Sequence, residues 1–114
     1  MSVFIVHPLN DKNTDISAAL EYGEPVYVNS RYVFPDELEG EELPHALYNK
    51  MLRAVDKFDI EADYLLIAGD HLQLVAMSAL LAERWGAFRV LRFDRQAEGY
   101  VIVNIEARIN VSSP

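Results

Sequence analysis

The stretch Tyr64–His71 constrains the fold more than any other part of the chain. An apolar run from Tyr64 to Ala68 stops at Gly69-Asp70, and a strongly helical segment begins at once. A buried parallel strand that leads straight into a crossover helix has this pattern in α/β sheets. Asp70 is a suitable N-cap, and Gln73 follows three residues later, close to the capping-box pattern. The stretch therefore predicts a central strand, a tight turn and a helix over 71–85.

The remaining segments alternate between strands and helices. Runs of apolar or β-branched residues predict strands at 3–6, 25–28, 88–93 and 100–105. Apolar residues that recur every three or four positions predict helices at about 14–22 and 44–58. Turn formers at 94–99 suit a hairpin loop, so the last strand is expected to be antiparallel.

This order of elements predicts one fold class. Right-handed crossovers and short connections favour a doubly wound sheet with the spatial order 2-1-3-4-5. We therefore expect a small three-layer α/β sandwich, Rossmann-like or flavodoxin-like, whose five-stranded sheet is mostly parallel. A single domain is expected over residues 1–106, followed by a flexible tail over 107–114.

Composition excludes several classes of function. The chain has no cysteine, so disulfides, thiolate catalysis and Cys-type metal centres are ruled out. The net charge of −8 argues against a nucleic-acid partner, because phosphate contacts need clustered Lys and Arg. No apolar run reaches roughly 18 residues, and no basic leader precedes the first strand, so neither a membrane span nor a signal peptide is expected. The expected location is the cytoplasm.

Polar residues are predicted to meet at the carboxyl edge of the sheet. His7 follows the first strand, and Gly69-Asp70-His71 follows the third, on either side of the point where the strand order reverses. Ligands bind at such switch points in open α/β sheets. Three more polar residues follow the second strand, and the predicted ligand-binding set is His7, Asn29, Ser30, Arg31, Gly69, Asp70 and His71.

Each member of this set also has a structural interpretation. Asp70 could act as a general base or bind a ligand hydroxyl, but helix capping explains it completely. His7, Asp70 and His71 could form a two-His-one-carboxylate metal set, although Asp70 and His71 are adjacent and their side chains can diverge. The turns lack the glycine-rich phosphate loops, so no cofactor is expected. No catalytic residue or metal ligand is predicted; enzyme activity is left open, with a non-enzymatic role preferred.

Two blocks of the sequence resemble a group of small tailed-phage proteins. The first block is Val3–Val6 with Asp15–Ala19 and Tyr22-Gly23; the second is Leu65–Gly69, an Ala-rich helix through Ala76, Ala79 and Ala82, then Gly86 and Leu91–Phe93. The middle of the chain, 31–63, departs from the pattern in length and charge. The resemblance implies a viral accessory protein in the host cytoplasm and brings no catalytic residues with it.

Two surfaces are candidates for contacts with proteins. The acidic segment 36–42 suits a basic surface on a host protein, unless it is simply solvated. The helix over 71–85 is apolar nearly all round, which predicts a homodimer contact near Trp85. The preferred hypothesis is a non-enzymatic phage accessory protein that binds a host protein. The alternatives are a nucleotide-like ligand module at the carboxyl edge and, with less support, a metal-dependent hydrolase.

Overall fold

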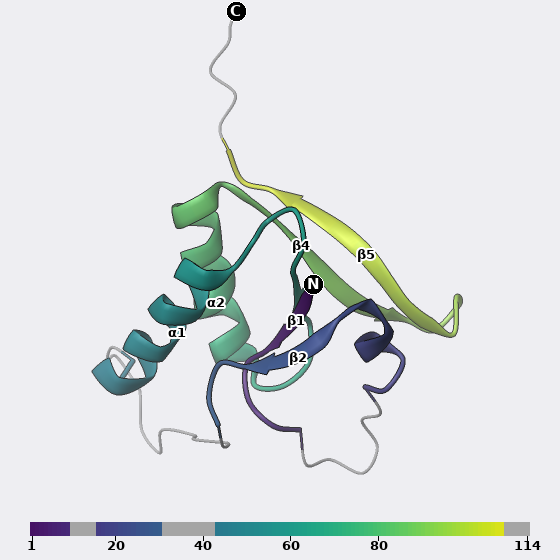
Figure 1. Cartoon of the computed structure of the whole chain (residues 1–114), viewed down its shortest axis with the longest axis horizontal. Helices are drawn as coiled ribbons and strands as arrows, with labels where there is room; N and C mark the ends of the chain where they lie inside the picture. Colours follow the sequence, from purple (N-terminus) through teal and green to yellow (C-terminus); the bar gives the residue numbers. More distant parts are fainter. Residues whose placement is uncertain (10–15, 31–42, 109–114) are drawn as a thin grey trace, which may run out of the picture.

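A five-stranded sheet forms the centre of the molecule (Figure 1). The computed structural model describes residues 1–9, 16–30 and 43–108. Its strands are β1 (Ser2–Ile5), β2 (Glu24–Tyr27), β3 (Tyr64–Leu66), β4 (Ala87–Asp94) and β5 (Gly99–Glu106). They lie in the order β2-β1-β3-β4-β5, with β4 and β5 antiparallel and the other neighbours parallel. The predicted α/β class, strand order and antiparallel last strand are confirmed.

Helices cover the two faces of this sheet unequally. The helices α1 (His45–Lys57) and α2 (His71–Trp85) lie side by side on one face, and the 3-10 turn η1 (Ala19–Tyr22) packs on the other (Figure 1). The helix predicted at 14–22 is thus a 3-10 turn in its described part, while residues 10–15 lie outside the described residues. The turn ends at Gly23, and the chain then enters β2, where the Glu24 N–H donates to the Met1 carbonyl at 3.3 Å.

Alternation along β1 explains why four consecutive apolar residues open the chain. Phe4 and Val6 face the helices, where Phe4 packs against Phe58 with ring centroids 5.0 Å apart. Val3 and Ile5 face η1 and pack with Ala19. A parallel strand buried on both faces needs this continuous apolar run.

Neither helix in the described part of the chain is long and apolar enough to cross a membrane.

The helix α2 is held at both ends and along its side within the same chain. Asp70 Oδ2 accepts a hydrogen bond from the Gln73 N–H at 3.0 Å, which confirms the predicted N-cap. Gly86 ends the helix in the left-handed conformation, with φ of 80°. Trp85 Nε1 donates to the Val55 carbonyl of α1 at 2.8 Å, so this indole is already used inside one protomer.

An exposed ion pair closes the end of β5. Arg108 Nε and Nη2 each donate to a carboxylate oxygen of Glu106 at 2.7 Å, and the Arg108 N–H donates to Glu106 Oε1 at 3.0 Å. These side-chain and backbone hydrogen bonds from Arg108 lower the pKa of Glu106 to about 2. The described start of the predicted tail, 107–108, is therefore in contact with β5; residues 109–114 lie outside the described residues.

We expect an NMR titration of the Glu106 carboxyl to give a pKa near 2, which rises toward the ordinary 4.5 in Arg108→Gln. A lowered folded pKa means that the pair stabilises the protein above about pH 4.5. That contribution is lost as the pH falls from there toward 2. The same pKa in both proteins would contradict the assignment to Arg108.

Candidate functional site

His7 connects the end of β1 to the turn between β3 and α2. Its Nε2 accepts a hydrogen bond from the Asp70 N–H at 2.9 Å, and its Nδ1 lies 2.9 Å from the Pro8 carbonyl oxygen. A backbone N–H can only donate, so Nε2 carries no proton and Nδ1–H donates to Pro8. His7 is therefore a neutral, buried imidazole with both ring nitrogens engaged.

Asn29 and Gln73 form a second link at the same edge. Asn29 Nδ2 donates to Gln73 Oε1 at 3.1 Å and to the Val6 carbonyl at 3.3 Å. Both side chains are about 1% exposed, so these bonds lie out of contact with water. Buried polar groups need such partners, because an unsatisfied one costs roughly 1–3 kcal/mol. This link joins Val6, the residue that follows β1, to the second residue after β2 and to the first turn of α2.

Gly69 makes the close approach of these segments possible. Its φ is +103°, and a Cβ there would lie 2.9 Å from Val6 Cγ2 and 3.0 Å from His7 Nε2. A side chain larger than hydrogen would push the His7 ring away from the Asp70 N–H. The glycine thus serves local geometry rather than a phosphate loop.

The predicted ligand-binding set is only partly brought together. His7, Asn29, Gly69 and Asp70 converge at the carboxyl edge, where their polar groups bond to one another. His71 and Ser30 are exposed, and Arg31 lies outside the described residues. A metal set of His7, Asp70 and His71 does not form, because neither His7 nitrogen has a lone pair left for a metal ion. The described residues contain no group of three metal-ligating side chains.

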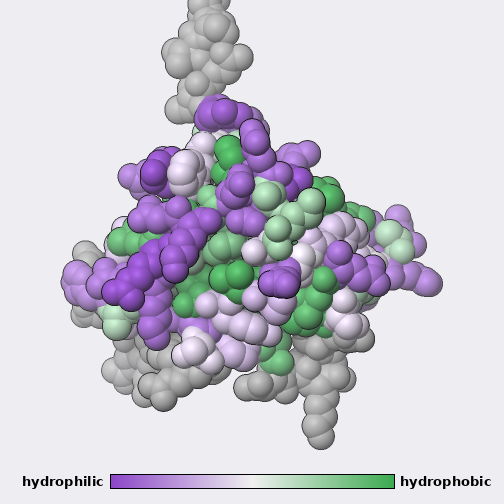
Figure 2. All heavy atoms as spheres, viewed as in Figure 1, coloured by the Kyte–Doolittle hydropathy of each residue, from purple (hydrophilic) through white to green (hydrophobic). Residues whose placement is uncertain are grey.

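A different surface, which we call the basic groove, lies between α1 and the edge strand β2. It has a volume of about 290 Å³ and is lined by Phe4, Val26, Tyr27, Val28, Ser30, Lys50, Arg53, Ala54 and Lys57. The floor is apolar, because the register that pairs Phe4 with Val26 turns both side chains toward the helices. Figure 2 shows hydrophobic surface between long hydrophilic side chains on the side where α1 lies in Figure 1.

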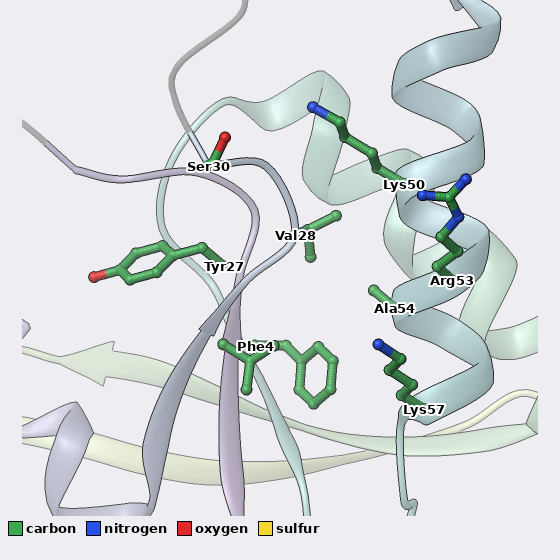
Figure 3. A pocket seen from close by; sticks show the side chains of 9 residues that line it. Phe4, Tyr27, Val28, Ser30, Lys50, Arg53, Ala54 and Lys57 are labelled. Carbon is green, nitrogen blue, oxygen red and sulfur yellow. The ribbon is translucent and has the colours of Figure 1, made fainter.

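Three cations from α1 give the basic groove its charge. Lys50, Arg53 and Lys57 are spaced by three and four residues, so they line one side of the helix. Figure 3 shows Lys50 and Lys57 extending from α1 toward the side of β2 and Arg53 running along the helix, while the Tyr27 ring points away from α1. None of the three forms an ion pair within residues 1–9, 16–30 and 43–108. In a chain with 10 Lys and Arg against 18 Asp and Glu, this grouping stands out.

A comparison with known protein families identifies the family of this chain. The family model described as "Phage Pam3 gp32-like protein" matches residues 1–107. The chain belongs to this family. It is therefore a phage protein, as the resemblance of its two end blocks predicted. No curated protein and no solved structure matches it significantly.

The basic groove of this phage protein was missed by sequence reasoning. Helical periodicity placed Lys50, Arg53 and Lys57 away from the apolar face of α1, which is typical of an ordinary solvated face. The only sequence signal was their shared side of the helix in an acidic chain. What makes a groove is the edge strand opposite, and that placement comes from the sheet order.

Proposed function

We propose that this phage protein is a non-enzymatic binding protein and that the basic groove holds an anionic, nucleotide-like ligand. The observation that supports this is the row of Lys50, Arg53 and Lys57 over the apolar floor made by Phe4 and Val26. Cations bind phosphate oxygens, while an apolar floor accommodates a base or another planar group. The volume of about 290 Å³ is at the small end for a ligand site, which suits a mononucleotide.

The proposed site differs in place from the one predicted at the sheet's switch point. The polar groups of His7, Asn29 and Asp70 are engaged with one another, so a ligand there would have to break those bonds. The lysine and arginine ends in the basic groove are exposed, and a ligand can reach them without disturbing the fold. Ser30 is the one described member of the predicted set that lines this groove.

The chemistry of the groove supports binding rather than turnover. Its described lining supplies three cations, the Ser30 hydroxyl and apolar surface, with no carboxylate or imidazole. Such a set can hold and orient an anion. Histidine, the side chain that most often serves as a general acid or base, and the carboxylates are both missing from this described lining.

Isothermal titration with ATP, AMP and inorganic pyrophosphate tests this function. We expect ATP to bind the wild-type protein and Arg53→Glu/Lys57→Glu to weaken binding at least about tenfold, or roughly 1.4 kcal/mol. Binding should also weaken between low salt and about 0.15 M salt, because exposed charges are screened over roughly 8 Å there.

The matched control is Arg92→Glu/Arg95→Glu. Both of these arginines are exposed, Arg92 near the end of β4 and Arg95 just after it, and neither lines the groove, so the variant changes the net charge equally without touching the groove. Its ATP affinity should stay within about twofold of wild type. Equal losses in both variants, or no binding of any of the three probes at millimolar concentration, would refute the proposed site.

The host-protein hypothesis remains a prediction from sequence. The acidic segment 36–42 on which it depends lies outside the described residues. A role in the host cytoplasm is likewise part of the proposal, and it fits a phage protein that acts by binding.

A further inference from the structure

We infer that β5 pairs with β5 of a second copy of this chain, so that two sheets join into one continuous sheet across a two-fold axis. The inference is independent of the basic groove, because β2 and β5 lie at opposite edges of the sheet. It starts from the backbone of β5, whose eight residues, Gly99–Glu106, form an outer strand with a neighbour on one side only.

Hydrogen-bond geometry identifies the backbone groups on the outer side of β5. The Ala107 N–H donates to the Gly86 carbonyl at 2.8 Å, and the register pairs Ile105 with Phe88 and Val103 with Val90. In an antiparallel ladder, hydrogen-bonded pairs alternate with pairs that are not bonded to each other. The odd-numbered residues of β5 therefore bond to β4, and the N–H and C=O groups of Ile102 and Asn104 point outward. No strand within the described ranges of the chain reaches them.

The side chains of β5 favour pairing instead of preventing it. Residues 99–105 carry no charge and no proline, and Ile102 and Ile105 are 44% and 37% exposed. The opposite edge differs, since β2 contains Pro25, which has no N–H, beside the charged Glu24. Proline and charge are the usual means of blocking an edge strand, while an uncharged β-branched edge is a template for another strand.

A second copy fits this edge better than an unrelated strand. Antiparallel pairing of β5 with itself satisfies the outward groups of both copies at once, as a two-fold interface requires. The uncharged centre of β5 also lets two chains of net charge −8 approach without opposing like charges in the ladder. Apolar side chains on both faces, among them Ile102 and Ile105, would then meet their counterparts across the axis.

The apolar side of α2 is the other candidate for the dimer interface, because the sequence predicted a homodimer contact through the helix over 71–85. Val75 is 66% and Leu72 is 40% exposed on this helix. The backbone of α2 is hydrogen-bonded within the helix, so an interface through α2 would use its side chains only. The outward N–H and C=O groups of β5 can add main-chain hydrogen bonds to an interface, so β5 offers a second copy more than side-chain contact alone.

Sedimentation velocity of the full chain from micromolar to about 200 µM tests the inference. We expect the wild type to dimerise, Ile102→Lys to weaken dimerisation at least about tenfold, and Val75→Lys to dimerise like the wild type. Both positions are exposed, so both lysine variants should fold, as circular dichroism would verify. Amide exchange supplies the second readout: Ile102 and Asn104 should become protected as the protein concentration rises.

Each outcome decides for or against β5. A wild type that stays monomeric at the highest concentration would overturn the inference, and so would a dimer lost only in Val75→Lys. Should both variants dissociate, slow exchange at Ile102 and Asn104 in the wild-type dimer supports the β5 interface, and fast exchange there overturns it. Persistence of the dimer in both variants with fast exchange at these amides would overturn it as well.

Discussion

Gly69→Ala is expected to lower the free energy of unfolding by about 3 kcal/mol. The φ of +103° is strained for alanine, and the new Cβ would lie 2.9 Å from Val6 Cγ2 and 3.0 Å from His7 Nε2. To relieve the contact, the His7 ring has to move, and its bond from the Asp70 N–H lengthens. Urea denaturation followed by circular dichroism measures the loss, which corresponds to a fall of roughly 15 °C in the melting temperature.

Gly99→Ala is the matched control for this prediction. A Cβ at Gly99 meets only the Ala97 carbonyl oxygen, at 3.9 Å, and its φ is not in the left-handed region. We expect a change below about 1 kcal/mol there. Equal losses at the two glycines would show that Gly69 has no special geometric role. Folded Gly69→Ala should still bind ATP within about twofold, because the basic groove is lined by other residues.

Much of the fold could be predicted because local pattern and global topology agree. Four apolar residues at Val3–Val6 are buried on both faces, as a continuous run predicts. Gly69-Asp70 marks the junction between β3 and α2, and Asp70 caps the helix as expected. The helix expected at 14–22 was wrong in its described part, since helical spacing over one short apolar face cannot distinguish an α-helix from a single 3-10 turn.

For the candidate site, the sequence could predict which residues lie near one another but not how they interact. The sheet order brings His7, Asn29 and Asp70 to one edge, but the sequence does not reveal that these groups bond to each other. The contact between His7 and Asp70 joins residues 63 apart, and the one between Asn29 and Gln73 joins residues 44 apart. Hydrogen-bond direction depends on side-chain placement, which residue spacing does not give. For the same reason, the sequence indicates only a solvent-exposed face for the cations of α1, because it does not show that β2 lies opposite them.

Asn29→Asp is expected to cost about 4 kcal/mol at pH 7, because it puts an uncompensated charge at a site about 1% exposed. The Asn29 amide nitrogen donates to the Val6 carbonyl and to Gln73 Oε1, and a carboxylate oxygen in its place would face two acceptors. Burial and these acceptors raise the pKa of the new carboxyl in the folded state. The extra loss is therefore absent below its unfolded pKa of about 4, and it grows until the pH exceeds the raised folded value.

Asn49→Asp makes the same chemical change on the exposed side of α1 and separates burial from charge. We expect it to alter the free energy of unfolding by less than about 0.5 kcal/mol, with no comparable dependence on pH. Urea titrations of both variants between pH 4 and 7 provide the comparison. A loss in Asn29→Asp that is small, or the same at both ends of this range, would mean that water reaches the carboxyl edge and that His7, Asn29 and Asp70 remain open to a ligand. A large loss confined to higher pH would assign these residues to holding β1, β2 and α2 together, and would leave the basic groove as the surface where an anion can bind without unfolding that edge.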